Sequence, residues 1–361
     1  MATAQIFETM GQIALHRNEP DQAITWYNQS LDQSRTATAL SNLGYAFLLK
    51  SEWDKSRANL EDAIALDDSL QEAHNNLAIV LSKMGDDTGA LSHLLQTGRP
   101  AVAFNNMGAR IVFTARDQAR GEATLARLRE SGPGLEHRMH LADLTRLSEM
   151  KRVAREIAVI EPRIDVLMNN AGAMFSEVQI TEDGFERTFA LNHMSYFVLS
   201  HGLRDRLLAT PGARIVNTSS NAHRHARLDY DDPQTTKNYR MFKAYCRSKL
   251  YNILFTRELS RRMKGSGITV NTLHPGFVAT RFGDQTNGAG GIVFRILKLL
   301  AITPVQGAET LIYLASSDKV SGITGEYFYK CAPEVATKQA LDEEASKWLW
   351  TESDRLARLA D

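Results

Sequence analysis

A small residue recurs at a nearly constant interval between Met1 and Gly108 of this chain. Gly11, Gly44, Ala78 and Gly108 follow one another at similar spacings, each directly behind a bulky apolar residue. Twelve positions after the first three come further small residues, and four positions later come large ones; they are Ala23, Ser56 and Ala90, then Tyr27, Leu60 and Leu94. Because small residues let antiparallel helices approach closely and large ones fill the groove between pairs, this spacing predicts stacked helix pairs. A helical bundle with a chance period is the alternative.

The spacing resembles that of the tetratricopeptide repeat. Its small–small–large positions would be Gly11/Ala23/Tyr27, Gly44/Ser56/Leu60 and Ala78/Ala90/Leu94. Three repeats fit about residues 4–98, and Pro100–Gly108 reads as the opening of a fourth helix pair that is not completed. The resemblance implies that residues 1–108 form a helical array that binds a peptide or a partner protein along its concave face.

The sequence texture changes at Ala109, where short β-branched and apolar runs begin to alternate with helical segments. Strands are expected at Arg110–Thr114, 138–143, Ile164–Met168, Ala213–Thr218 and Ile268–Leu273, and helices at 119–131, 146–161, 181–210 and 241–264. Strands that alternate with helices build a parallel sheet with helices on both faces. Residues 109–361 are therefore predicted to form a second domain of the α/β class.

Polar motifs stand at the ends of these expected strands and in the helix between the last two. In order they are Asn169-Asn170-Ala171-Gly172, Ser219-Ser220, Tyr245-Cys246-Arg247-Ser248-Lys249, and His274-Pro275-Gly276 with Thr280 beyond it. Ligands of open α/β sheets bind at the carboxyl ends of the strands. The four motifs in this order resemble the short-chain dehydrogenase/reductase family. That resemblance implies a Rossmann-like, doubly wound parallel sheet and an NAD(P)-dependent oxidoreductase.

The chemistry of this family explains the spacing of its central motif. Tyr245 and Lys249 are four residues apart and so share one face of a helix. An ammonium beside a phenol lowers the tyrosine pKa from ~10 toward neutrality, where the phenol can exchange a proton with a substrate oxygen. The resemblance implies that Tyr245 is the general acid/base, that Lys249 tunes it and holds the nicotinamide ribose, and that Ser220 hydrogen-bonds the substrate oxygen. Asn192 matches the position that supports a proton-relay water near the lysine, with a plain helix residue as the alternative.

The resemblance also indicates which cofactor to expect. Arg116 follows the first expected strand, where a basic residue can meet a 2′-phosphate and an Asp would take a free 2′-hydroxyl. NADP is therefore expected, with NAD as the alternative. Asp143 matches the family's contact to the adenine, or is a turn residue at a strand end. The residues expected at the cofactor are Arg116, Asp143, Asn170, Ala171, Gly172, Tyr245, Lys249, Pro275, Gly276 and Thr280.

Three further features resemble the retinol-dehydrogenase-like branch of the family. The long stretch between Ser220 and Tyr245 includes the insertion Leu228–Asp232, Arg257-Glu258-Leu259 follows the active-site motif, and Lys347-Trp348-Leu349-Trp350 lies near the end. This branch acts on small lipophilic alcohols, aldehydes and ketones. Four apolar residues could line the substrate pocket, or belong to the core: Leu191, Met194, Phe282 and Phe294.

One element of the family pattern is missing from this sequence. The family begins with a strand and a Gly-rich turn of the Thr-Gly-x-x-x-Gly-x-Gly type, whose backbone amides approach the pyrophosphate. No GxxxGxG precedes Arg110, and the five residues between Phe104 and Arg110 are too few for the crossover of about a dozen that parallel strands need. The expected sheet therefore lacks its central first strand and has two unpaired inner edges, unless the second and fourth strands close up or another element fills the gap. Cofactor binding is expected to be weakened.

Composition narrows the classes of function that remain open. The formal net charge is zero, with −6 on residues 1–108 and +6 on 109–361, so nothing points to nucleic acid. Two cysteines make no disulfide framework, and no spacing suggests a metal. No membrane span or signal peptide is evident, so a cytoplasmic location is expected.

Two interpretations of function remain open. One is an oxidoreductase in which another element replaces the missing strand, with the repeats as a targeting module. The other is a non-enzymatic interaction protein in which functional repeats precede a dehydrogenase remnant, through a deletion or a joining of neighbouring genes near Gly108-Ala109. A regulatory nucleotide sensor is disfavoured, because the phosphate-binding turn is the missing part.

Overall fold

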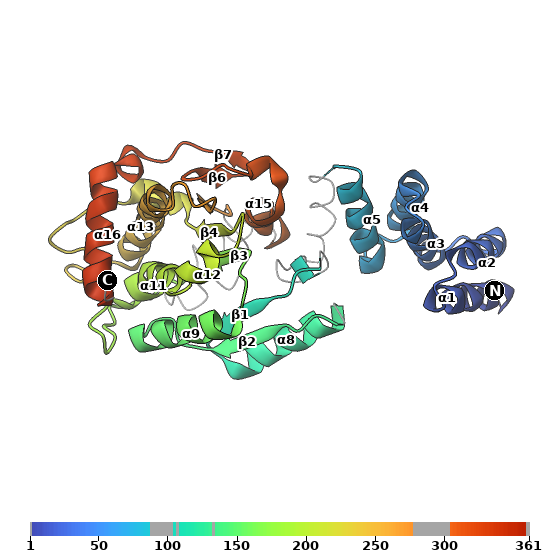
Figure 1. Cartoon of the computed structure of the whole chain (residues 1–361), viewed down its shortest axis with the longest axis horizontal. Coiled ribbons are helices and arrows are strands. Elements are labelled where there is room, and N and C mark those ends of the chain that lie inside the picture. Colours follow the sequence, from blue (N-terminus) through green and yellow to red (C-terminus); the bar gives the residue numbers. More distant parts are fainter. Residues whose placement is uncertain (1, 87–103, 106–107, 132–133, 277–303, 359–361) are drawn as a thin grey trace. The chain divides into compact units, whose positions relative to one another are not determined.

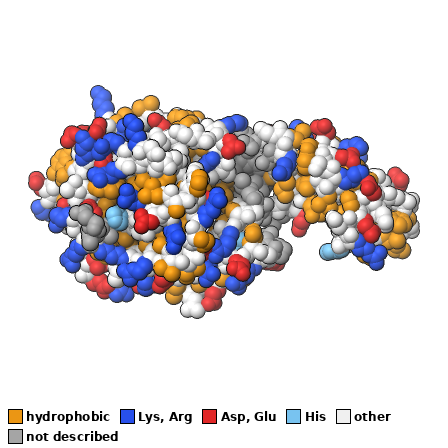
Figure 2. All heavy atoms as spheres, in the orientation of Figure 1, with side chains coloured by type: hydrophobic (Ala, Val, Ile, Leu, Met, Phe, Trp, Pro, Cys, Tyr) orange, Lys and Arg blue, Asp and Glu red, His pale blue; other side chains and the backbone are white. Residues whose placement is uncertain are grey.

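The computed structural model describes residues 2–86, 104–105, 108–131, 134–276 and 304–358 (Figure 1). The chain divides into two compact units, Met1–Ala109 and Arg110–Asp361. On the face that Figure 2 shows, basic and acidic side chains are interspersed. Within the described ranges no helix is long and apolar enough to cross a membrane.

The first unit is helical. Its described helices are α1 (Ala2–His16), α2 (Pro20–Gln33), α3 (Ala37–Leu49), α4 (Trp53–Leu66) and α5 (Gln71–Lys83). Consecutive helices pack against each other, α1 on α2 and α3 on α4. Pro20 stands at the start of α2, where its missing N–H costs nothing, and the Thr36 side chain caps α3 by accepting from the Ala39 N–H.

Small residues allow this close helix packing. A Cβ added to Gly11 would lie 2.7 Å from the Tyr27 ring, and one added to Gly44 would lie 2.6 Å from Leu60 Cγ. The Ser56 hydroxyl also donates to the Gly44 carbonyl oxygen at 2.7 Å. Gly11 therefore packs against Tyr27, and Gly44 against Leu60. Ala90 and Leu94 lie outside the described residues.

Gly108 ends a helical turn at the junction of the two units. Its φ is +81°, its N–H donates to the Asn105 carbonyl, and the Ala109 N–H donates to the Phe104 carbonyl. This pair of hydrogen bonds is the Schellman termination, which favours glycine at the left-handed position.

The second unit begins with a two-stranded parallel sheet. It consists of β1 (Val112–Ala115) and β2 (Arg138–Leu141), with α8 (Gln118–Ser131) between them and α9 (Leu147–Ile160) after them. Glu161, at the end of α9, is buried and accepts hydrogen bonds from Arg110, and it lies 3.5 Å from Arg138. These two guanidinium groups hold the pKa of Glu161 below its usual range, chiefly through the Arg110 hydrogen bonds.

A separate five-stranded sheet follows, with the order β3-β4-β5-β6-β7. Its strands are β3 (Val166–Asn169), β4 (Arg214–Thr218), β5 (Thr269–Leu273), β6 (Tyr327–Tyr329) and β7 (Ala332–Pro333). All neighbours are parallel except the antiparallel pair β6–β7. Both α13 (Met241–Arg262) and α15 (Pro304–Ser316) pack against β4 and β5.

The sheets are not joined within the described part of this unit. No described strand hydrogen-bonds to both β1 and β3, and these two strands do not pair with each other. All four residues of β1 and the first three of β3 are only half-buried, whereas β4 and β5 are buried after their first residue. Strands β1 and β3 are therefore less covered than β4 and β5.

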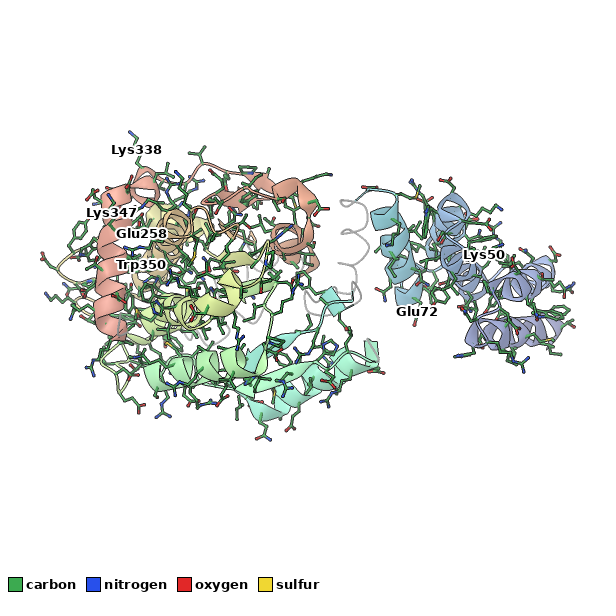
Figure 3. All side chains as sticks on the ribbon, viewed as in Figure 1. Lys50, Glu72, Glu258, Lys338, Lys347 and Trp350 are labelled. Atoms are coloured by element: carbon green, nitrogen blue, oxygen red, sulfur yellow. The ribbon has the colours of Figure 1, made fainter. Side chains whose placement is uncertain are left out.

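The core of this unit lies where α9, α11 (Ser195–Gly202), α13 and α16 (Glu343–Ala357) meet the sheet. Glu258 on α13 is almost fully buried and pairs with Arg261 and Arg262, and the Arg262 guanidinium lies 4.3 Å from the centre of the Trp350 ring on α16 (Figure 3). The Trp350 ring also stacks on Phe255 of α13. The C-terminal helix is thus fixed to α13 by a buried acid and by aromatic contacts.

Most expected element bounds agree with the structure to within two residues, but the long helix at 181–210 was wrong. The helical segment begins only at Arg187 and consists of α10 (Arg187–Phe189), a π-helix η1 (Ala190–Met194), α11 (Ser195–Gly202) and α12 (Arg204–Leu208). Gly184 has φ +80°, and the Glu186 carboxylate accepts from the Thr188 and Phe189 N–H groups. A turn and an N-cap therefore precede the helix.

Candidate active site

The catalytic set expected from sequence comes together where β4 ends beside α13. Ser220 follows β4 and caps a 3-10 helix, η2 (Asn221–His225), by accepting from the Ala222 N–H. The Tyr245 phenol is hydrogen-bonded to the Ser220 side chain. Lys249 Nζ lies 5.8 Å from the centre of the Tyr245 ring. Two residues from different elements thus form one polar pair, with an ammonium over the phenol ring.

The end of β4 is tied to α13 by three hydrogen bonds. The Thr218 carbonyl oxygen accepts from Lys249 Nζ at 2.9 Å and from Asn252 Nδ2 at 3.0 Å. The Ser219 hydroxyl donates to the Lys249 carbonyl oxygen at 2.6 Å. These bonds fix the strand end, and with it Ser220, against the helix that carries the tyrosine and the lysine.

Burial sets the proton affinities of both titratable groups. It lowers the pKa of Lys249 to about 7. It raises the pKa of Tyr245 to about 12, which the hydrogen bond from Ser220 only partly opposes. The expected lowering of the tyrosine pKa is therefore absent in the chain alone, because desolvation by burial outweighs the hydrogen bond from Ser220.

Asn192 holds the loop after β3 against the lysine. It is fully buried in the π-helix η1; its Oδ1 accepts from the Ala173 N–H at 2.9 Å, and its Nδ2 donates to the Ala173 oxygen and to Ser248 Oγ, both at 3.0 Å. A Cβ added to Gly172 would lie 3.3 Å from both Asn192 Oδ1 and Lys249 Nζ. Asn192 therefore links η1 to the loop after β3 and to Ser248, and is not a plain helix residue. Such π-helical turns are frequent at functional sites.

The asparagines at the end of β3 have two different environments. Asn170, Ala171 and Gly172 lie toward the surface, and Asn170 Oδ1 accepts from Thr218 Oγ1 at 2.8 Å. Asn169 is buried; its Nδ2 donates to Ser200 Oγ and Asn217 Oδ1. Asn217 in turn donates to Thr256 Oγ1, which completes a buried polar chain from α11 across two strands to α13.

Comparisons with known proteins agree with this geometry. The family model for short chain dehydrogenase matches residues 99–289. The chain is 39% identical over 290 residues to retinol dehydrogenase 14 of Homo sapiens, covering 75% of this chain and 85% of the relative. The chain belongs to the short-chain dehydrogenase family. It is also 39% identical over 269 residues to retinol dehydrogenase 13 of Homo sapiens, covering 72% of this chain and 80% of the relative.

Solved structures show the same fold for the dehydrogenase unit. The crystal structure of an uncharacterized protein from Mycobacterium Paratuberculosis aligns with a TM-score of 0.58 at 28% identity, over 72% of this chain and 88% of that one. A short-chain dehydrogenase/reductase mutant of Serratia marcescens aligns with a TM-score of 0.51 at 22% identity, over 65% of this chain and 90% of that one, and shows the fold alone. The family match begins at residue 99, ten residues before the boundary expected from sequence.

Two residues, Arg116 and Asp143, were expected near the adenine end of the cofactor. Arg116 is exposed directly after β1. The Asp143 carboxylate instead accepts from the Thr145 N–H and hydroxyl, so it closes the turn after β2. The second interpretation of Asp143, a strand-end turn residue, thus describes its contacts.

After β5, only part of the expected site lies within the described residues. Pro275 is half-buried, and Gly276 has φ +85° and donates its N–H to His274 Nδ1. Thr280, Phe282 and Phe294 lie outside the described residues. Met194 is fully buried in the core and Leu191 packs against that core. Both residues therefore belong to the core, which was the alternative to lining a substrate pocket.

Two histidines of the dehydrogenase unit lie close to the site; no role was expected for either, although His274 stands in one of the sequence motifs. His274 Nε2 lies 3.0 Å from Glu334 Oε2, and its ring stacks on Tyr329 with centres 4.1 Å apart. His223 Nδ1 lies 2.8 Å from the Ser220 carbonyl oxygen. Glu334 is far from His274 along the chain, so no spacing pattern connects them.

Arg247 anchors the insertion that precedes the tyrosine. Its buried guanidinium donates to the Arg227 and Asp232 carbonyl oxygens and to Thr235 Oγ1. It also lies 3.6 Å from the Asp229 carboxylate. The insertion is therefore fixed to the helix that carries Tyr245.

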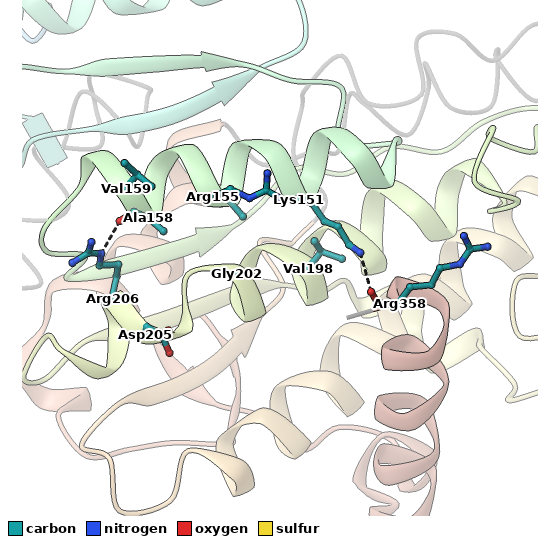
Figure 4. Close-up of a pocket in the computed structure, with 10 residues that line it drawn as sticks. Lys151, Arg155, Ala158, Val159, Val198, Gly202, Asp205, Arg206 and Arg358 are labelled. Atoms are coloured by element: carbon teal, nitrogen blue, oxygen red, sulfur yellow. Dashed lines mark hydrogen bonds between the residues drawn. The ribbon is translucent and has the colours of Figure 1, made fainter. Parts of the chain in front are cut away.

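One groove of the dehydrogenase unit does not involve the catalytic set. It has a volume of about 520 Å³ between α9, α11 and the end of α16, and its lining includes Lys151, Arg155, Asp205, Arg206 and Arg358 (Figure 4). Lys151 Nζ donates to the Arg358 carbonyl oxygen, and Arg206 Nε to that of Ala158. These cations stabilise helix ends, and no described catalytic residue faces the groove.

Proposed function

We propose that the dehydrogenase unit is an NADP-dependent oxidoreductase that interconverts a lipophilic alcohol with an aldehyde or ketone. The observation that carries this proposal is the hydrogen bond between Ser220 and Tyr245 beside the buried ammonium of Lys249. The substrate class is supported by the similarity to proteins named retinol dehydrogenases.

The residues near Lys249 fit the nicotinamide end of such a cofactor. Among the described residues the ammonium donates only to the Thr218 carbonyl, so two of its N–H groups remain for ribose hydroxyls. Gly172 keeps the adjacent space open, because a Cβ there would press on the ammonium. When bound, the cofactor supplies or takes the hydride.

The chain's own residues would handle the proton. Ser220 positions the substrate oxygen, and the neutral Tyr245 phenol donates its proton to that oxygen as a carbonyl is reduced. A pKa of about 12 makes the phenol a weak acid in the chain alone, and a more fully protonated Lys249 would favour proton release. Arg116 would meet the 2′-phosphate, with NAD as the alternative cofactor.

The pyrophosphate end fits less well, and this favours a second candidate function. Among the described residues no strand joins β1 to β3, and the sequence has no Gly-rich turn before Arg110. If the chain is an N-terminally truncated dehydrogenase fused behind the repeats, cofactor affinity is weakened and the repeats alone remain functional.

The first unit is proposed to be a tetratricopeptide-type module that binds a peptide or protein. Ile6, Met10 and Ile13 support this, because they lie on one face of α1 and are 57%, 38% and 47% exposed. An apolar stripe on a soluble helix commonly marks a contact surface.

A titration of the full chain with NADPH, followed by nicotinamide fluorescence, separates the two candidates. Binding in the micromolar range with oxidation of NADPH by a long-chain aldehyde would support the oxidoreductase. No binding up to millimolar NADPH, with intact helical circular dichroism, would overturn it in favour of the interaction module. Sequencing the gene across codons 95–115 tests the fusion separately.

A further inference from the structure

Lys249 is a buried cation that lacks a described counter-ion. It is 3% exposed, and its ammonium donates a hydrogen bond to the neutral Thr218 carbonyl. Among the described residues no carboxylate pairs with it. A buried ammonium costs free energy unless its surroundings stabilise the charge.

Two aromatic rings lie against this ammonium. Lys249 Nζ lies over the Tyr245 ring, 5.8 Å from its centre, and over the Tyr196 ring, 5.7 Å from its centre. Both distances are within the range of about 6 Å over which a ring's negative face attracts a cation. Tyr245 already has a proton-transfer assignment, whereas Tyr196 has none.

Neither solvent exposure nor a hydrogen bond from its hydroxyl to a described residue explains a tyrosine at position 196. It stands on the first turn of α11, four residues after Asn192, and is 1% exposed. Its hydroxyl has no hydrogen-bond partner in the described part of the chain. Burial, together with Tyr245, holds its pKa well above the ordinary value, so it is a neutral phenol and not an anion beside the lysine.

We propose that Tyr196 is a positioning residue of this site, whose ring face keeps the Lys249 ammonium charged and in place before any cofactor binds. The groups that face the ammonium are Tyr245 on its own helix, Tyr196 on α11, the Thr218 carbonyl on β4, Gly172 in the loop after β3, and Asn192 on η1. Of these only the two tyrosines titrate, and both remain neutral near pH 7. The ring, rather than the hydroxyl, is the part of Tyr196 that acts. This inference rests on the proposed function only in the claim that Lys249 takes part in catalysis.

The test measures the proton affinity of Lys249 directly in the full chain. Lysine side chains are labelled with ¹³C at Cε, and the signal that disappears in Lys249→Met is titrated by NMR. Tyr196→Phe keeps the ring and should leave the pKa of Lys249 unchanged. Replacement of Tyr196 by pentafluorophenylalanine keeps the shape but reverses the ring's charge distribution, and should lower that pKa by about one unit, a tenfold loss of proton affinity.

Two comparisons make the result decisive. Tyr196→Leu removes the ring and should lower the pKa as well, whereas Phe197→Leu removes the adjacent buried ring of α11 and should not. An unchanged Lys249 pKa in the fluorinated chain would overturn the proposal even if Tyr196→Leu fails to fold. An equal shift in Tyr196→Phe would also overturn it, by assigning the effect to the hydroxyl.

The readout needs neither cofactor nor turnover. If NADPH fails to bind but fluorination lowers the Lys249 pKa, the proposed function fails and the positioning role stands. If NADPH binds and the Lys249 pKa is unchanged in the fluorinated chain, the positioning role fails and the proposed function stands.

Discussion

Lys249 donates a hydrogen bond to the carbonyl oxygen of Thr218, 2.9 Å away, and its ammonium lies over the ring of Tyr245, 5.8 Å from the ring centre. The lysine is thus held by the strand end that also carries Ser220. The proton affinities of the two groups are therefore linked to how the end of β4 is packed.

The buried lysine should make stability depend on pH. Its pKa is about 7 in the folded chain and about 10.4 when unfolded, so between these values the unfolded chain binds more protons. Stability should then rise with pH in that window, by at most about 1.4 kcal/mol per pH unit from this group. Urea unfolding at pH 7, 8 and 9 should show the advantage of Lys249→Met over the natural chain shrinking as pH rises. Parallel pH profiles would contradict a buried, pKa-lowered lysine.

Removal of the phenol hydroxyl should abolish proton transfer without disturbing the fold. Tyr245→Phe is expected to lower kcat/KM for a long-chain aldehyde by about 10²–10⁴-fold, because the general acid is lost. The NADPH dissociation constant should change little, because the Lys249 contact remains. Cys246→Ala is the matched control, since it alters the adjacent buried residue of α13 and should retain kcat. A variant as active as the natural chain would assign the proton to another group.

Close packing of the first helix pairs should appear as coupling between Gly44 and Leu60. A Cβ at residue 44 would lie 2.6 Å from Leu60 Cγ, so Gly44→Ala should destabilise the first unit by about 1–3 kcal/mol. Leu60→Ala should cost about 2–5 kcal/mol through the cavity it leaves. Because the second change makes room for the first, the double variant should be less destabilised than the sum, by about 0.5–3 kcal/mol. Chemical denaturation followed by circular dichroism measures this; additive effects would mean that the helices can separate freely.

Cofactor affinity should improve if the missing family element is supplied. A chain in which a strand, a Thr-Gly-x-x-x-Gly-x-Gly turn and a helix replace residues 99–109 should bind NADPH at least about tenfold more tightly, because backbone amides at a helix N-terminus would cradle the pyrophosphate. The control carries the same insertion with valine in place of the turn glycines. Equal affinity in both chains would show that the turn is not what limits binding.

The sequence predicted the parts of the dehydrogenase unit that depend on local spacing. Tyr245 and Lys249 are one helical turn apart, and Ser220 ends a strand, so their meeting followed from periodicity. The raised pKa of Tyr245 did not follow, because it depends on burial by segments far away in the chain. The contact of His274 with Glu334 was unpredictable for the same reason. The start of the helix at Arg187 was missed because a turn at Gly184 and a Glu cap replaced the expected helical residues.

The separation of the two sheets also has a consequence for how this unit opens. The pair β1–β2 is connected to the rest through the packing of α9 on α11 and through the Arg110 pairing with Glu161, not through a continuous hydrogen-bonded ladder among the described strands. Regions with few shared contacts unfold as separate cooperative segments. Amide protons of β1 and β2 should thus exchange with solvent through a sub-global opening that leaves β4 and β5 protected. The half of the fold that would carry the adenine end of a nucleotide is then the half that opens first.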